Sequence, residues 1–382
     1  MKTYCKDVSI TDRDLVTIAV KDCLRKKQTR HDVVSMIADL TGADHRSVLE
    51  RIQCEGLMKM RDVIDLIVDS CIAELTAKKL TLKPINYVQK FDSSSRKWRT
   101  IGVQDIRQQL YDYVAVYAMQ PILRRVGEFQ CASVPGRGQS YGVRKISSWL
   151  RDPRIAYAVK CDIKKCYPSI DRARLMAWLR ERIRNDDLLW LIETLIGTFD
   201  RGLAIGSYLS QWLCNLWLSP VYHFAKEGLY KVRRGKRIPY VDHALFYMDD
   251  FLLLGKSKSD LGKAFRAIEK MVAEMGLTIK PSWRKWHIGS KEFIDMMGFR
   301  IYRDRVTIRQ RIFLRIRRTF RRVRKRIETR KPVSLKDAQK CVSYFGKFKE
   351  SNSFNLIRSL SVFRTISVSK GVIANEYQVL CR

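Results

Sequence analysis

The chain has 382 residues, and its 74 Lys and Arg outnumber its 39 Asp and Glu to give a formal net charge of +35 and a pI near 10.0. Length indicates two or three domain-sized pieces. The charge excludes an ordinary enzyme of small metabolites and favours a polyanionic partner, most simply nucleic acid, with a membrane surface as the weaker alternative. No apolar run reaches the roughly 20 residues that span a bilayer, and the ten cysteines include no Cys-x-x-Cys pair, so we expect a cytoplasmic protein with reduced thiols, no membrane span and no structural zinc site.

Residues 9–80 are predicted to be helical, because apolar residues recur there at three- and four-residue spacing. Thr11, with Asp14 three residues later, predicts a helix start. The histidines of this region, His31 and His45, are expected to be surface or capping residues. Nothing here points to chemistry.

A basic strand is predicted at 96–108, and a helix follows it at 110–123. Lys97 and Arg99 on that strand would clamp a triphosphate by charge-assisted hydrogen bonds, although a run of charges is usually a solvated face. The glycine-rich basic loop at 133–142, which contains Arg137, fits neither the P-loop nor the dinucleotide fingerprint. Its glycines would let the backbone approach a phosphate or a template strand, and a plain surface loop is an equal alternative.

The first candidate catalytic carboxylate is Asp162, at the end of an apolar strand that is followed by a short turn and a helix at 172–183. Tyr167, five residues later, would pack under the sugar of an incoming nucleotide, where a bulky ring excludes a 2′ hydroxyl. A core tyrosine is the alternative. The stretch 202–218 is a glycine-containing turn that leads into an apolar helix, and it would support template and nucleotide.

Two apolar runs in 244–255 flank Asp249 and Asp250 and predict a β-hairpin with both carboxylates at its turn. Two anions at an apolar tip are costly unless a cation neutralises them, and such oxygen ligands suit Mg²⁺; a solvated turn is the alternative. With Asp162, the pair makes the carboxylate set of a two-metal nucleotidyl transferase, whose ions lie about 3.5 to 4 Å apart. We therefore predict Asp162, Asp249 and Asp250 as catalytic metal ligands, Ile163 as a further metal contact, and two Mg²⁺ ions that Mn²⁺ could replace.

A basic helix is predicted at 311–330, where ten of the twenty residues are Lys or Arg and apolar residues keep helical spacing. Its apolar stripe would pack inward, while Arg315, Arg318 and Arg322 would contact the phosphates of a duplex without reading sequence. A generic charged surface helix is the alternative. Ser334 and Asp337 predict a capping box for a second helix.

Taken in order, these stretches resemble the successive motifs of reverse transcriptases over residues 84–350. Residues 247–250 resemble the family's Tyr-x-Asp-Asp box, Asp162 with Tyr167 its first catalytic motif, and 99–108 its fingers motif. Residues 276–280 and 297–302 resemble the later palm motifs; in the second of these, Met297 and Gly298 would grip the primer end.

The resemblance implies an α+β fold of the right-hand polymerase class, with fingers, a palm with an antiparallel sheet, and a helical thumb. It places a helical N-terminal region at 1–83, fingers at 84–155, the palm at 156–305, and the basic thumb and tail at 306–382.

The subclass resemblance rests on residues 205–211. Most reverse transcriptases carry Gln-Gly followed by Ser-Pro here, whereas this chain has Ile205 before Gly206 and Gln211 after Ser210, which resembles the reverse transcriptases of diversity-generating retroelements. Stretches 279–283 and 343–346 are similar to that group as well. Since Ile205 replaces an amide, one hydrogen-bonding group beside the nucleotide is lost, and geometry would be checked less stringently. The expected nucleotide contacts are Lys97, Arg99, Tyr167, Ile205, Gly206 and Gln211.

This resemblance implies RNA-templated synthesis of DNA from deoxynucleoside triphosphates, with misincorporation opposite template adenines and mutagenic copying of a template-repeat RNA for a variable gene. It implies as partners the cognate RNA, the cDNA–primer duplex and a small basic accessory protein that forms an oligomeric barrel, in a bacterial or phage setting. One alternative is an antiphage-defence reverse transcriptase, because some of these vary in the same motif. Another is a catalytically silent RNA-binding scaffold, against which the intact Asp162, Asp249 and Asp250 argue.

Overall fold

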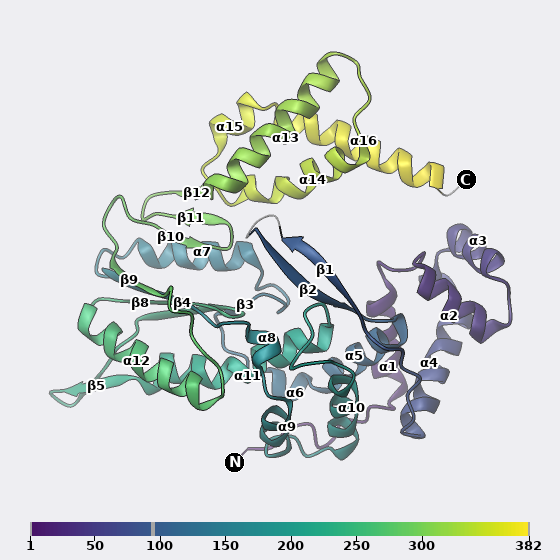
Figure 1. The fold of residues 1–382 in the computed structure, drawn as a ribbon, viewed down its shortest axis with the longest axis horizontal. Coiled ribbons are helices and arrows are strands. Elements are labelled where there is room, and N and C mark those ends of the chain that lie inside the picture. The colour runs from purple at the N-terminus through teal and green to yellow at the C-terminus, as the bar shows by residue number, and fades with distance from the viewer. Residues whose placement is uncertain (1, 93–95, 381–382) are drawn as a thin grey trace. The chain divides into compact units, whose positions relative to one another are not determined.

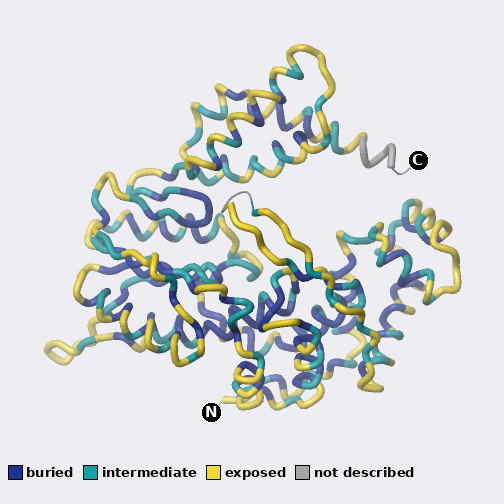
Figure 2. The backbone as a smooth tube through the Cα atoms, in the orientation of Figure 1, coloured by how far each residue is buried: buried dark blue, intermediate teal, exposed yellow. Residues whose placement is uncertain are grey.

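The computed structural model describes residues 2–92 and 96–380, and these form two compact units. Unit 1 comprises Met1–Ser133, Asp162–Phe224 and Ala267–Pro281, and unit 2 comprises Val134–Cys161, Ala225–Arg266 and Ser282–Arg382. Figure 1 labels the elements, and Figure 2 shows where the backbone is buried. Each unit is assembled from three separate segments, whereas the domains predicted from the sequence are continuous ranges. The two divisions differ in kind, so the predicted domain boundaries stay predictions.

The N-terminal part of unit 1 is helical, as predicted. Its elements are α1 (Arg13–Leu24), α2 (His31–Thr41), α3 (His45–Glu55), the 3₁₀ turn η1 (Leu57–Lys59) and α4 (Arg61–Thr76). The predicted start at Thr11 is wrong by one residue: Asp12 caps α1 by accepting a hydrogen bond from the Leu15 amide at 2.8 Å. The Thr11 hydroxyl is instead hydrogen-bonded to the Ser9 hydroxyl at 2.9 Å.

The rest of unit 1 contains a two-stranded antiparallel hairpin and a second set of helices. These elements are β1 (Asn86–Asp92), β2 (Lys97–Val103), α5 (Ile106–Ala118), α6 (Gln120–Leu123), β3 (Gln130–Cys131), α8 (Cys166–Ser169), α9 (Arg172–Arg180), α10 (Asp186–Gly197) and α11 (Tyr208–His223). The single helix predicted at 110–123 is therefore two helices, and the break falls just before Pro121, which lacks a backbone donor. Likewise, the helix predicted at 172–183 ends earlier, at Arg180.

Unit 2 is built on antiparallel strands and ends in helices. Its elements are α7 (Gln139–Leu150), β4 (Tyr157–Asp162), the π-helical turn η2 (Phe224–Gly228), β5 (Tyr230–Arg233), β6 (Lys236–Pro239), β7 (His243–Tyr247), β8 (Asp250–Gly255), α12 (Lys258–Glu274), β9 (Arg284–His287), β10 (Ile294–Met296), β11 (Phe299–Ile301), β12 (Val306–Ile308), α13 (Gln310–Glu328), α14 (Leu335–Lys349), α15 (Phe354–Ser359) and α16 (Val362–Leu380). Strands β7, β8, β4 and β9 follow one another in one sheet, and β10, β11 and β12 form another. Both β4 and α12 continue across the boundary between the units.

The helices after β12 confirm the predicted basic amphipathic helix. Helix α13 buries Ile312, Ile316, Phe320 and Val323 along one face, and the Phe320 ring meets Phe348 of α14 edge-on at 5.5 Å. Of the predicted capping box, the Ser334 cap is present, because Ser334 accepts from the Asp337 amide at 3.4 Å at the start of α14, whereas the Asp337 carboxylate accepts from Arg322. No helix among the described residues is long and apolar enough to span a membrane.

Candidate active site

The hairpin β7–β8 carries the adjacent carboxylates Asp249 and Asp250. Tyr247 pairs with Asp250, so Met248 and Asp249 form a two-residue turn. The prediction that both carboxylates lie at the turn is wrong for Asp250, which is the first residue of β8. The strands are buried, and the rings of Phe246 and Phe251 stack at 3.7 Å. The apolar core therefore fixes the backbone on which the two carboxylates sit.

Asp250 is paired with a cation from the neighbouring strand. The Lys160 ammonium on β4 lies 3.1 Å from the Asp250 carboxylate, and β4 follows β8 in the sheet. Both side chains are largely removed from solvent. A positive charge at this end of the sheet offsets part of the cost of holding a carboxylate there.

Asp162, the last residue of β4, is fixed in unit 1 by a second short stretch of chain. Its carbonyl accepts from the Lys280 amide at 2.8 Å, and its carboxylate accepts from the Lys280 ammonium. Ile163 is fully buried and forms an antiparallel bridge with Ile279. The backbone around the predicted catalytic aspartate is thus held on both sides of the strand end.

The chemistry of these side chains fits a hard divalent cation. The predicted ligands are carboxylates, which Mg²⁺ prefers, and two of them, Asp162 and Asp250, already attract lysine ammonium groups. Within residues 2–92 and 96–380, no three His, Cys, Asp or Glu side chains are arranged as a ready-made metal cluster. The lysines show that these strand ends draw positive charge.

The predicted nucleotide-binding residues Lys97 and Arg99 of unit 1 lie on β2, and the turn that contains Ile205 and Gly206 contacts the other end of this strand. Lys97 and Arg99 are exposed on this strand, and Arg99 also pairs with Asp92 of β1 at 3.2 Å. At the other end of β2, the Gly102 amide donates to the Ile205 carbonyl at 2.8 Å. Gly206 has φ +116, and a Cβ there would lie 2.5 Å from the Gly102 carbonyl oxygen, so only glycine fits this close approach.

A buried carboxylate that the sequence analysis did not single out holds the same turn. Asp112 of α5 accepts from the Ser207 hydroxyl at 2.7 Å and from the Leu209 amide at 3.3 Å, and Ser207 in turn caps α11. Burial raises the pKa of Asp112 to about 6, although these hydrogen bonds oppose the shift. The only sequence signal for Asp112 is a charged residue inside an apolar helix, with no hint of its partner.

Tyr167 contacts this turn from a further segment, and Gln211 lies on α11, which follows the turn. The Tyr167 carbonyl accepts from the Leu203 amide at 2.9 Å, and Gly202 approaches the same carbonyl so closely that a Cβ would lie 2.6 Å away. Gln211 accepts from the Ser133 hydroxyl at 2.6 Å. Of the predicted residues of unit 1, Tyr167, Ile205 and Gly206 therefore lie at the 202–206 turn, whereas Lys97 and Arg99 lie toward the other end of β2.

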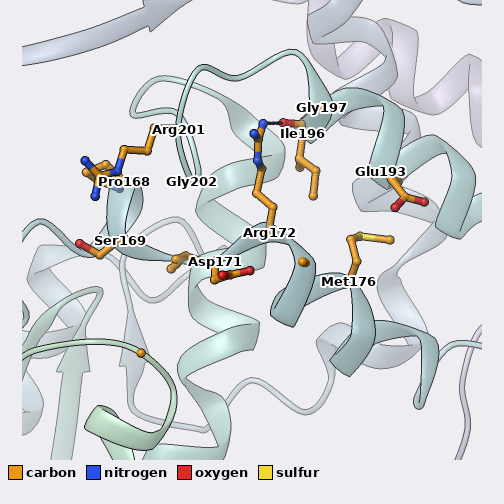
Figure 3. A pocket seen from close by; sticks show the side chains of 13 residues that line it. Pro168, Ser169, Asp171, Arg172, Met176, Glu193, Ile196, Gly197, Arg201 and Gly202 are labelled. Atoms are coloured by element: carbon orange, nitrogen blue, oxygen red, sulfur yellow. Dashed lines mark hydrogen bonds between the residues drawn. The ribbon is translucent and has the colours of Figure 1, made fainter.

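A cavity of about 700 Å³ lies next to α8, between α9 and the end of α10 (Figure 3). The Arg172 guanidinium spans it and donates to the carbonyls of Ile196 at 2.8 Å and Phe199 at 2.6 Å. These carbonyls lie at the end of α10, where helix carbonyls lack helical partners. Arg172 thus ties α10 to the helix that follows Tyr167.

In unit 2, the predicted primer-binding turn joins β10 to β11. Met297 and Gly298 have φ of +55 and +84. Lys347 of α14 donates to the Met297 carbonyl at 3.0 Å and to Gln139 at 2.7 Å, and burial lowers its pKa to about 8. Lys347 was not predicted from sequence, because it lies 50 residues from the turn that it holds.

The predicted arginines of unit 2 occupy different environments. Arg318 is exposed on α13 and Arg315 is half-buried there, whereas Arg322 makes a bidentate pair with Asp337 of α14 at 2.6 and 2.9 Å. The Arg322 guanidinium lowers the pKa of Asp337. Arg137, half-buried before α7, closes a turn by donating its amide to the Val134 carbonyl at 3.0 Å.

Comparison with known proteins identifies the family. The family model described as reverse transcriptase (RNA-dependent DNA polymerase) matches residues 88–301, more than half of the chain. No curated protein matches. Among solved structures, that of apo telomerase from Candida tropicalis truncated from its C-terminal domain is similar at 12% identity and a TM-score of 0.41, covering 79% of this chain and 84% of that one. The mixed helix-and-sheet fold and the family match confirm the predicted right-hand polymerase class. The chain therefore belongs to the reverse transcriptase family of RNA-dependent DNA polymerases.

Proposed function

We propose that the chain is the reverse transcriptase of a diversity-generating retroelement, which copies a template-repeat RNA into cDNA with errors opposite adenine for transfer into a variable gene. Ile205 is the observation that carries this proposal. Its carbonyl is bound by Gly102 of β2 and its apolar side chain is half-buried, at the place where most of the family carries an amide.

An apolar side chain at this position lowers the energetic difference between correct and incorrect pairs. A site that hydrogen-bonds its substrate penalises a misplaced partner, because the site's polar group is then left unsatisfied. Ile205 has no polar side-chain group to leave unsatisfied. Asp112 and Gly102 hold the turn by hydrogen bonds. What Ile205 changes is therefore the hydrogen-bonding capacity of the side chain and not the order of the loop.

For catalysis, we assign Asp162, Asp249 and Asp250 as ligands of two Mg²⁺ ions, with Ile163 as a further contact and Mn²⁺ as a substitute. Bound ions would activate the primer 3′ hydroxyl and hold the leaving pyrophosphate. In support, β4 and β8 are neighbours in the sheet, and Lys160 on β4 reaches Asp250 from two residues before Asp162.

The remaining predicted residues bind the substrates. Lys97 and Arg99 neutralise the triphosphate, Tyr167 excludes a 2′ hydroxyl, and the turn at 205–206 with Gln211 supports the nucleotide and template. The template–primer duplex is contacted by Arg137, Met297, Gly298, Arg315, Arg318 and Arg322. The cognate RNA, the cDNA and a small basic barrel-forming accessory protein complete the proposed bacterial or phage system.

Primer extension by the purified protein tests this function, on an adenine-containing RNA template with Mg²⁺ and all four deoxynucleotides, followed by sequencing of the product. We expect substitutions concentrated opposite adenine, no product from Asp249→Ala, and fewer errors from Ile205→Gln than from the apolar control Ile205→Leu. Faithful product would favour an antiphage-defence enzyme. No product even with the native RNA and accessory protein would favour an RNA-binding scaffold.

A further inference from the structure

The hairpin β5–β6 is exposed on both faces and has no part in the site described above. Its strands pair Tyr230 with Pro239 and Arg233 with Lys236 around a two-residue turn, Arg234–Gly235. Every residue from 230 to 239 is exposed except Lys231, which is half-buried, and Figure 2 shows this loop as exposed along both strands. A two-stranded hairpin without a buried face is only marginally stable by itself.

The hairpin is held to the rest of unit 2 at its base. Lys231 forms an ion pair with Asp260, in the first turn of α12, at 2.6 Å. Asp260 is buried and its amide also donates to Ser257. This anchor fixes the base and leaves the tip projecting beside the start of α12, away from the helices α13 and α14 of the same unit (Figure 1).

The tip carries positive charge that the described residues do not neutralise. Five of the ten residues in 230–239 are Lys or Arg, and no acidic residue lies between Glu227 and Asp242. Of these five, Lys231 alone has an acidic partner among the described residues, and the Arg237 guanidinium stacks over the Tyr230 ring at 4.6 Å. Arg233 and Lys236 stand directly opposite each other, an arrangement that destabilises a hairpin. A bound polyanion would remove that repulsion.

The side chains of the hairpin suit the phosphate backbone of RNA. The Lys and Arg side chains of residues 230–239 would pair with phosphate oxygens, a contact that positions RNA without reading its sequence. Folded RNA is recognised chiefly by shape and by its backbone. An enzyme of this family already handles an RNA, and the folded parts of that RNA outside the copied segment offer such a backbone.

We propose that the tip of hairpin β5–β6, formed by Arg233, Arg234 and Lys236, is a second RNA-binding surface that holds the phosphate backbone of folded RNA outside the template–primer duplex. This inference rests on the RNA-directed activity of the family. It requires no metal ion, no nucleotide and no catalytic residue.

The test compares two variants that each lose three positive charges, at different places in the chain. The hairpin variant is Arg233→Ser, Arg234→Ser, Lys236→Ser, and the control is Lys26→Ser, Lys59→Ser, Lys79→Ser, which removes exposed lysines near α1, η1 and α4 of unit 1. Binding of bulk tRNA is measured by filter retention between 50 and 200 mM salt. We expect roughly a tenfold loss of affinity for the hairpin variant and a salt slope shallower by about 2 to 3, as each lost phosphate contact lowers the slope by about 1.

The control should keep the wild-type affinity and slope. Both variants should extend a primer on a 20-nucleotide RNA template at the wild-type rate, and both should keep the wild-type melting temperature, the hairpin variant melting no lower because a like-charge pair is gone. Equal losses of tRNA binding by both variants, or none by the hairpin variant, would overturn the proposal. Retained tRNA binding with lost binding of poly-glutamate would overturn it in favour of an acidic protein partner.

Failure of the proposed function is distinguishable from failure of the RNA-binding proposal. It would appear as absent extension by the wild-type protein, whereas the tRNA measurement does not depend on extension.

Discussion

Two hairpins that follow each other in unit 2 have the same turn length and opposite chemistry. In β5–β6 the turn is Arg234–Gly235, the strands are exposed and the tip is cationic; in β7–β8 the turn is Met248–Asp249, the strands are buried and the tip is anionic. The first turn residue has a left-handed φ in both, +50 for Arg234 and +56 for Met248. Local backbone geometry therefore does not decide what a hairpin does.

Burial decides which countercharge each tip requires. A buried hairpin can keep carboxylates only with cations at hand, and Lys160 supplies one to Asp250. An exposed hairpin keeps its cations in water at little cost, so they remain available to a mobile polyanion. The contrast is between a tip on buried strands, proposed to bind a small cation, and a tip on exposed strands, proposed to bind a large anion.

The largest effect should come from the anionic tip. Asp249→Asn removes a carboxylate but keeps its size, and we expect primer extension to fall by at least about 10³-fold, while tRNA binding stays at the wild-type level. Chelation of divalent ions should likewise abolish extension in the wild-type protein. Extension that survives Asp249→Asn would remove the functional distinction between the two hairpins.

Truncation inside each hairpin tests the difference in burial. Phe246→Ala in β7 should lower the free energy of unfolding by about 3 to 5 kcal/mol, because Phe246 is fully buried and stacked on Phe251. Val232→Ala in β5 should change it by no more than about 0.5 kcal/mol, since Val232 is 65% exposed. Urea unfolding of both variants measures the change in the free energy of unfolding. Equal decreases for the two variants would contradict the difference in burial between the two hairpins.

Asp112 provides a third way of holding a charge, because burial and hydrogen bonds act on it and no cation among the described residues pairs with it. Its folded pKa of about 6 exceeds its usual value of 3.8, so the native protein binds the extra proton between these values and its stability should fall as pH rises from about 4 to about 6. The size of this contribution is about 3 kcal/mol. Asp112→Asn cannot titrate, so its melting temperature should lack that part of the pH dependence. Parallel wild-type and variant profiles would show that Asp112 titrates normally.

The smallest effect concerns the shared left-handed turn residue. Arg234→Asn creates the Asn-Gly pair that such turns favour and removes one like charge, so it should raise the free energy of unfolding by about 0.5 to 1 kcal/mol. Met248→Asn has the same backbone benefit but exchanges a buried thioether for an amide, and should be destabilising. Thermal melts of the two variants should therefore shift in opposite directions.

Sequence reasoning succeeded where the chemistry lies within one element. The strand ending at Asp162, the hairpin with Asp249 and Asp250, and the amphipathic helix α13 follow from hydrophobic periodicity, and the Ser334 cap follows from local hydrogen-bonding chemistry. Sequence reasoning was less accurate at element boundaries. Asp12 rather than Thr11 caps α1, and the single helix predicted at 110–123 is interrupted before Pro121.

It could not find partners that are distant in the chain. Lys280 lies 118 residues from Asp162, and Ser207 lies 95 residues from Asp112. Such pairs depend on the tertiary fold, and nothing in local periodicity or charge marks them. The tip of β5–β6 was overlooked for a different reason, since a short basic stretch in a chain of net charge +35 does not stand out by composition.

The threefold interleaving of the two units constrains how the polypeptide can acquire its structure during synthesis. Unit 2 begins at Val134, before unit 1 has received its last segment, Ala267–Pro281. A ribosome must therefore release about three quarters of the chain before the first unit can close. Cutting the gene once cannot yield either unit alone, and two of the three segments of unit 2 are synthesised before unit 1 is complete.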